Sequence, residues 1–195
     1  MVRKQSTEEK PPSPTRKKRA TRVRKLKPRV FHAGVGSDHA AKPSMTWVRS
    51  PNFASRNGAQ IDTLILHNTD CTLASAVQRF KDPASQVSAH YIVDRDGAVT
   101  QMVRDSDTAW HSGKKDVNQR SIGIEVVAFS SALGMARAQE STLIALAKYV
   151  LAAYSVPLAN ILPHRDIKPT DCPGWIWPTD TDFRNWTTVK LGTKG

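Results

Sequence analysis

Apolar residues along this chain recur with the spacing of helices in some stretches and of strands in others. The clearest stretch is residues 137–154, whose apolar positions recur three and four residues apart at Leu143, Leu146, Ala147, Val150, Leu151 and Tyr154. These positions share one helix face, so we predict an amphipathic helix that ends before Pro157. Residues 72–81 are also compatible with a helix. A short closing helix is expected after Pro178, with Phe183, Trp186 and Val189 on one face.

Four short runs have the composition of strands: residues 63–66, 90–93, 99–103 and 121–128. The first is continuously apolar, which is typical of a buried strand. Asp96-Gly97 lies between the second and third runs and predicts a hairpin, because glycine accepts a positive φ at little cost. Strands that alternate with helices indicate an α/β domain with helices packed on a central sheet.

Charge divides the chain into two parts. Residues 1–30 contain twelve Lys or Arg and two Glu, which accounts for +10 of the total net charge of +12. With so few large apolar side chains, this segment cannot bury enough surface to offset its ordering entropy, so we expect it to be disordered. We therefore predict a basic tail and linker over residues 1–46 and a folded domain over residues 47–195.

No run of about 18 apolar residues is present, so no transmembrane helix is expected. The basic N-terminus is not followed by the apolar stretch of a secretory signal. On these grounds we expect a cytoplasmic chain that leaves the cell only if another process releases it.

Three residues have the chemistry of zinc ligands. His67 ends a predicted strand, and His164 and Cys172 flank a loop stiffened by Pro169 and Pro173. A catalytic zinc site uses three protein ligands and a water, and it accepts imidazole and thiolate. Spacing alone leaves another interpretation open, since a lone His is commonly a hydrogen-bonded structural residue and a lone Cys a buried apolar one. Two distant cysteines, Cys71 and Cys172, are weak evidence for a disulfide.

Five segments in order resemble the zinc N-acetylmuramoyl-L-alanine amidase family, over about 140 residues from Trp47 to Trp186. They are Ile65-Leu66-His67-Asn68-Thr69, residues 88–97 (SAHYIVDRDG), Ala109-Trp110-His111-Ser112-Gly113, residues 118–125 (NQRSIGIE) and residues 164–174 (HRDIKPTDCPG). The resemblance implies a central mixed β-sheet flanked by helices, with a groove over a zinc ion bound by His67, His164 and Cys172. Asp171 is the alternative third ligand, because some relatives use an Asp. The implied substrate is bacterial peptidoglycan, and a monomer is the default expectation.

The resemblance also implies the residue that moves the proton in amide hydrolysis. Relatives use either a Glu at the position of Glu125 or a Tyr just before the His that matches His90. Here that second position is Ala89, so we assign the role to Glu125. Without the motif, a solvent-facing Glu on an edge strand would be the simpler interpretation.

Thr170 is the second catalytic candidate, because a hydroxyl can donate a hydrogen bond to a developing oxyanion. Its alternative role is to cap the loop. Trp110, His111 and Asn68 are expected to bind substrate in the groove, although Trp110 could equally be a core aromatic residue. His90 is expected to be structural, and Lys168 to be a surface charge.

Three functional classes follow from these features. The first is a cell-wall hydrolase, such as a phage endolysin made in the host cytoplasm that reaches the wall by release or lysis. The second is a peptidoglycan-recognition module without activity. The third is a nucleic-acid-binding protein driven by residues 1–30, which are also suited to an anionic envelope surface. The near-neutral remainder of the chain argues against the third.

Overall fold

The computed structural model describes residues 41–129 and 134–192, and the basic segment 1–30 lies outside these ranges. Its helices and strands, in chain order, are β1 (Thr46–Trp47), β2 (Phe53–Ser55), β3 (Thr63–Asn68), α1 (Leu73–Lys81), η1 (Pro83–Ser85), β4 (Tyr91–Val93), β5 (Val99–Gln101), β6 (Asp107–Ala109), α2 (Lys115–Arg120), β7 (Ser121–Val126), α3 (Arg137–Tyr154), η3 (Leu158–Asn160), β8 (Ile161–Pro163), η4 (His164–Asp166) and α4 (Asp180–Leu191). None of the described helices is long and apolar enough to cross a membrane.

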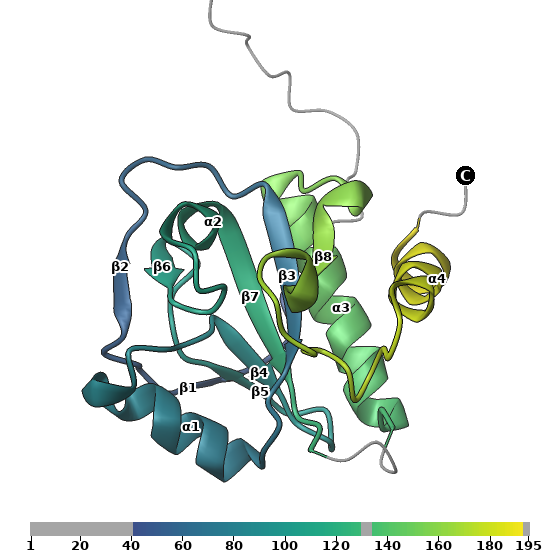
Figure 1. Ribbon diagram of the computed structural model, residues 1–195, viewed down its shortest axis with the longest axis horizontal. Helices are drawn as coiled ribbons and strands as arrows, with labels where there is room; N and C mark the ends of the chain where they lie inside the picture. The colour runs from purple at the N-terminus through teal and green to yellow at the C-terminus, as the bar shows by residue number, and fades with distance from the viewer. Residues whose placement is uncertain (1–40, 130–133, 193–195) are drawn as a thin grey trace, which may run out of the picture. The chain divides into compact units, whose positions relative to one another are not determined.

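The central sheet has six strands in the order β1-β5-β4-β7-β3-β8, and β2 pairs with β6 separately. Strands β4, β7, β3 and β8 run parallel, whereas β5 runs antiparallel to β4. This arrangement confirms the predicted mixed sheet flanked by helices (Figure 1). The predicted hairpin is β4–β5, and Gly97 in its turn has φ +89°.

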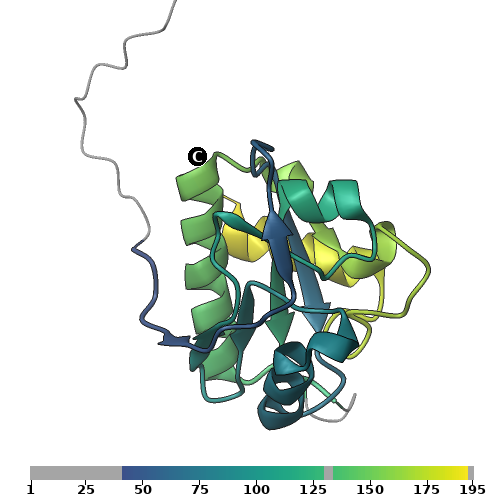
Figure 2. The same ribbon diagram turned by 90° about the vertical axis from the view of Figure 1, so that its left-hand side faces the viewer.

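Helices cover the two faces of the sheet, as the turned view shows (Figure 2). One face packs Leu64, Leu66, Ile122 and Ile124 against α3 and α4, where they meet buried residues such as Leu143 of α3. The other face packs against α1 through a smaller cluster that includes Ala76, Phe80 and Ile92. Parallel strands covered on both faces are expected to be apolar throughout, as the run 63–66 is.

Among the described residues, some that precede the boundary predicted at residue 47 already contact the domain. Met45 packs against the main core, and Lys42 Nζ lies 3.4 Å from Asp105 Oδ2. The extent of the tail itself stays a prediction.

The closing helix α4 completes the core, with one correction to its predicted face. Phe183 and Trp186 are buried, and Trp177 contacts both, with ring centroids 5.2 Å and 4.9 Å away. Val189 is 74% exposed, so its predicted place on the buried face is wrong, and Leu191 is buried instead. Val189 lies three positions after Trp186, but the buried stripe of α4 runs through Phe183, Thr187 and Leu191, which are four residues apart, so Val189 points away from the core.

Replacing Phe183 with Ala should lower the free energy of unfolding by about 3–5 kcal/mol, because a fully buried ring leaves a cavity. Val189→Ala is the matched control on the same helix, and it should change stability by no more than about 0.5 kcal/mol. Urea unfolding of both variants measures the difference. Equal effects would contradict the packing of α4 described here.

Candidate metal centre and active site

The register of three parallel strands brings the candidate residues together. His67 on β3 is paired with Glu125 on β7. Leu66 is paired with Pro163, the last residue of β8, so His164 emerges beside His67. The two imidazole rings have centroids 4.5 Å apart. Carboxyl ends of parallel strands are where sites form on α/β sheets, and here three strands contribute.

Cys172 reaches this site because the loop after β8 folds back. The η4 turn begins at His164, and Arg165 N donates a 3.0 Å hydrogen bond to Cys172 O. The sulfur then lies beside the end of β3, where Asn68 N approaches Cys172 Sγ at 3.4 Å. Residues separated by more than one hundred positions thus share one site.

The geometry of His67, His164 and Cys172 fits a metal ion. Their ligand atoms all lie within 4.8 Å of one another, and His67 Nδ1 is 3.8 Å from Cys172 Sγ. Zinc bonds of about 2.0–2.3 Å place two ligands of one tetrahedral ion roughly 3.5 Å apart. Asp171, the alternative ligand, is exposed and does not belong to this group.

The charges around the site also favour a cation. Burial, with a smaller effect of the nearby Glu125 charge, raises the pKa of the Cys172 thiol to about 12. Burial lowers the pKa of His67 well below its usual value, so that ring is neutral. A bound divalent cation would stabilise the thiolate form that burial alone disfavours. Zinc binds both thiolate and neutral imidazole.

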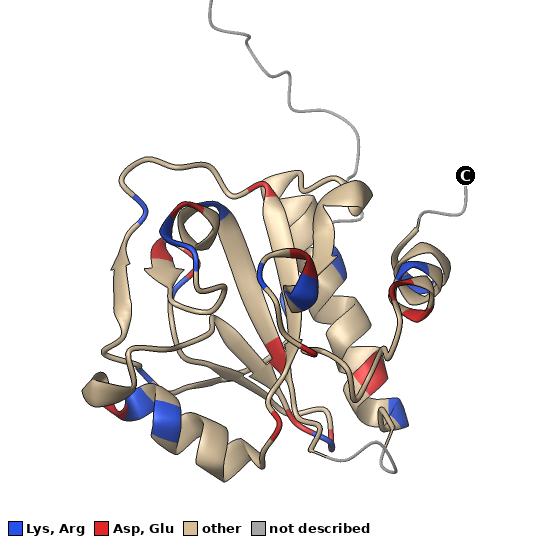
Figure 3. Cartoon of the chain, viewed as in Figure 1, with Lys and Arg blue, Asp and Glu red and all other residues tan. Residues whose placement is uncertain are grey.

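Glu125 is the acidic residue that lines the cavity at the candidate metal ligands. It is the only charged residue of β7, whose one acidic position is coloured red in Figure 3. Its Oε2 is buried and has no hydrogen-bond partner among the described residues. Burial raises the pKa of Glu125 to about 8, with a smaller opposing effect of Arg79. Because β7 is an interior strand, the alternative of an edge-strand Glu does not apply.

Thr170 and Asn68 lie at the same site, and each already has a contact within the protein. Thr170 Oγ1 accepts a 3.3 Å hydrogen bond from Cys172 N, which is the loop-capping role considered for it. Its hydroxyl hydrogen is not used by that bond. Asn68 Nδ2 donates to Ala128 O at 3.4 Å, and the residue lines the cavity over the site.

Two hollows that share lining residues meet at the site, beside a third of about 610 Å³ that Asn68, Thr170 and Cys172 line. A cavity of about 300 Å³ is lined by all three candidate ligands, Glu125 and Thr170. A larger cavity of about 790 Å³ shares Arg79, Trp110, His111 and His164 with it. Trp110 is half-buried and belongs to neither apolar core cluster, so its ring is placed to line the groove. His111 is 9% exposed, and its substrate-binding role stays a prediction.

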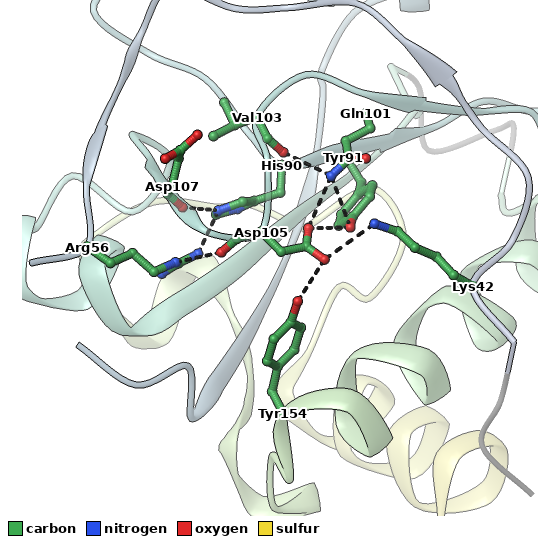
Figure 4. Close-up of polar contacts among 9 residues, drawn as sticks. All are labelled: Lys42, Arg56, His90, Tyr91, Gln101, Val103, Asp105, Asp107 and Tyr154. Carbon is green, nitrogen blue, oxygen red and sulfur yellow. Dashed lines mark hydrogen bonds and ion pairs between the residues drawn. The ribbon is translucent and has the colours of Figure 1, made fainter. Parts of the chain in front are cut away.

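A buried polar network holds the loops beneath the site (Figure 4). Arg56 is buried and donates to Asp105 O at 2.7 Å, Gln119 O at 2.7 Å and Ser121 O at 3.0 Å. It also contacts His90 Nε2 at 2.8 Å. Arg56 therefore ties β2, the β5–β6 loop and the start of β7 to one another.

The carboxylate of Asp105 connects this network to α3. It accepts hydrogen bonds from Tyr91, from Tyr154 at 2.9 Å and from Gln101 at 3.2 Å. His90 is fully buried and accepts a hydrogen bond from Gly123 N at Nδ1, as its predicted structural role requires.

Sequence reasoning missed several residues that build the site. Arg56 carries no motif, and only the burial of a charged residue reveals its role. Arg79 lies on α1 and lines both hollows, which its place on a helix did not predict. Ser121 and Gly123 were visible within the segment 118–125, but their partner His111 is brought to them by the fold.

The chain matches the family model described as N-acetylmuramoyl-L-alanine amidase over residues 57–175. It is 39% identical over 77 residues to N-acetylmuramoyl-L-alanine amidase A of Achromobacter lyticus, and the matched stretch covers 39% of this chain and 42% of the relative. It is 30% identical over 142 residues to the amidase AmiD of Escherichia coli, covering 61% and 51%. The chain thus spans about half the length of the curated relatives it matches.

Solved structures agree on the fold. The endolysin amidase LysCS from Clostridium intestinale superposes with a TM-score of 0.61 at 20% identity, covering 80% of this chain and 99% of that one. The catalytic domain of XlyA superposes with a TM-score of 0.58 at 22% identity, covering 77% and 99%. At these identities the likeness concerns the fold alone.

The buried His90 makes stability depend on pH. Burial, with a smaller effect of Arg56, lowers the pKa of His90 to about 3, whereas an unfolded His titrates near 6.5. The unfolded chain therefore binds a proton in this window that the folded chain does not, so stability falls as pH falls from 6.5 towards 3. One such group contributes about 1.4 kcal/mol per pH unit.

We expect His90→Gln to reduce the slope of unfolding free energy against pH by about one proton between pH 6 and pH 4. Urea unfolding at several pH values gives this slope. Other buried histidines contribute equally to both proteins, so they cancel in the comparison. An unchanged slope would show that His90 is charged in the folded protein.

Proposed function

Because the chain belongs to the N-acetylmuramoyl-L-alanine amidase family, we propose that it hydrolyses the amide bond between N-acetylmuramic acid and L-alanine in peptidoglycan. The observation that carries this proposal is the convergence of His67, His164 and Cys172 beside the buried carboxylate of Glu125. A recognition module without activity needs neither a complete ligand set nor a buried acid, so the arrangement favours catalysis.

In the proposed site His67, His164 and Cys172 hold zinc, which when bound supplies a water of lowered pKa and polarises the substrate carbonyl. The protein residues then have three tasks. They must hold the substrate amide over the site, accept the proton of the attacking water and give a proton to the leaving nitrogen.

Glu125 is suited to the proton transfer. A pKa near 8 lies close to neutral pH, where a general base and acid is most effective. As the water oxygen bonds to the carbonyl carbon, Glu125 takes the proton. It then delivers that proton to the L-alanine nitrogen while the C–N bond breaks. The products are a free lactyl carboxylate on the sugar and a free amine on the peptide.

Thr170 and the groove act on the rest of the substrate. The hydroxyl hydrogen of Thr170 is left to donate to the carbonyl oxygen as negative charge develops on it. The larger hollow is lined by Trp110 together with Arg79, Lys115 and Lys168. An aromatic face beside three cations suits a sugar attached to a peptide that carries carboxylates.

We propose a lytic setting for this activity, such as that of a phage endolysin. In this proposal the protein acts as a monomer, accumulates inside the cell that makes it and reaches the wall on release or lysis. We include Asn68 and His111 among the residues that contact the substrate or that support the metal-binding side chains.

Two variants separate the proposed roles at the site. Glu125→Gln should lower kcat on purified peptidoglycan by about 10²-fold or more while zinc content is unchanged, because general acid–base catalysis contributes this much. Cys172→Ala should lose activity and zinc together. Metal analysis of the purified variants and mass spectrometry of the digestion products provide both measurements.

Asp116→Asn is the matched control, because Asp116 is an exposed carboxylate on α2. It should keep full activity and zinc content. The amidase assignment would be refuted if the unsubstituted protein cleaved sugar–sugar bonds of peptidoglycan, or if its products carried no new L-alanine amines. Full activity of Glu125→Gln would refute only the role of Glu125.

We further propose that residues 1–30 bring the enzyme to an anionic envelope surface, on the strength of their net charge of +10. A basic segment binds polyanions through charge, and salt weakens that attraction. Deleting residues 1–30 should then reduce lysis of whole cells at low salt and leave cleavage of purified peptidoglycan intact. Equal loss on both substrates would contradict the proposal, as would salt-dependent binding to DNA with unchanged cell lysis.

A further inference from the structure

We propose that His111 is a positioning residue that, with Ser121 and Gly123, holds the ring of His67 so that its Nδ1 lone pair faces the metal site. The inference rests on the proposed function for the identity of the site, and it assigns His111 a different task from contact with substrate. A chain of hydrogen bonds from α2 to the metal site carries the argument.

The chain of hydrogen bonds begins at Ser121. Its hydroxyl donates to Val117 O at 2.8 Å, and a serine has only one hydroxyl hydrogen. His111 Nε2 lies 3.1 Å from the same oxygen. Since Ser121 Oγ has no second hydrogen to give, His111 Nε2 must carry the proton and donate it.

The same logic continues through the two rings. Both are buried, where a charged imidazole without a carboxylate partner is unfavourable, so each ring carries one proton. His111 Nδ1 is therefore an acceptor, and His67 Nε2, 3.0 Å away, is its donor. This leaves the lone pair of His67 on Nδ1, the atom that lies 3.8 Å from Cys172 Sγ.

Gly123 gives the His111 ring its place against β7. A Cβ at residue 123 would lie 2.5 Å from His111 Cγ and 2.6 Å from His111 Nδ1. No Cβ tolerates contacts this short, so any larger residue must displace the ring. Arg56 fixes the backbone at the other end, because it donates to Ser121 O at 3.0 Å.

His164 has a shorter support of the same kind. Its Nε2 lies 3.3 Å from Ser112 O, a carbonyl that can only accept, so Nδ1 is again left for the metal. Ser112 follows His111 directly, and Asn118 Oδ1 accepts from both backbone amides at 3.2 Å and 2.8 Å. One short loop therefore orients both histidine ligands. Hydrogen bonds of this type fix the tautomer of a ligating histidine and raise metal affinity.

The test compares two substitutions of one side chain. In His111→Asn the amide oxygen lies near the former Nδ1 and still accepts from His67 Nε2, whereas His111→Leu offers no acceptor. We expect zinc affinity, measured by competition with a chromophoric chelator, to fall about 10- to 100-fold in His111→Leu and only a few-fold in His111→Asn. The melting temperatures of the metal-free proteins report any general loss of packing.

Equal zinc affinity in His111→Leu and the parent would overturn the proposal. So would an equal loss in both variants, or a raised KM for peptidoglycan with zinc affinity unchanged, which is the result expected for a substrate-binding residue. Gly123→Ala retains every polar group and should also weaken zinc binding. It therefore tests this chain of hydrogen bonds if His111→Leu does not fold. Because the readout is metal affinity, a parent that binds zinc but does not cleave peptidoglycan would refute the proposed function and leave this inference standing.

Discussion

The site depends on one constraint, the parallel register of β3 with its two neighbours. Pairing His67 with Glu125 on one side and Leu66 with Pro163 on the other places two imidazoles and a carboxylate at one edge of the sheet. A shift of either strand by one residue would turn His67 or Glu125 to the opposite face. The apolar residues Leu64, Leu66, Ile122 and Ile124 prevent that shift, because it would expose the main core.

Two buried charged side chains near the site differ in how far the protein replaces the hydrogen bonds that water would give them. Arg56 is a buried cation whose hydrogen-bond partners are mainly backbone carbonyls, and this suits the planar, multiply donating guanidinium better than a Lys ammonium. Glu125 has the reverse situation, with a buried oxygen that lacks a partner among the described residues. The first arrangement stabilises a loop, and in the second burial raises the pKa of Glu125 to about 8.

Much of this was predictable from the sequence because strong local patterns and tertiary packing agree. The helix over 137–154, the strand at 63–66 and the hairpin at Asp96-Gly97 are confirmed. Val189 was placed wrongly because the buried stripe of α4 continues through Thr187, a polar residue that an apolar pattern does not mark, to Leu191. The three metal candidates were found through the resemblance, whereas the contacts of Arg56, Ser121 and Gly123 depend on side-chain packing across segments that spacing cannot report.

The strand order has a consequence for how this chain folds. β3 lies between β7 and β8, which follow it by roughly sixty and one hundred residues. Sheets built from such distant pairings fold slowly, since each pairing must first close a long loop. No short fragment of the chain contains His67, Glu125, His164 and Cys172 together. A partly synthesised chain therefore lacks the site, which can form only after β8 has joined the sheet and the loop to Cys172 has folded back.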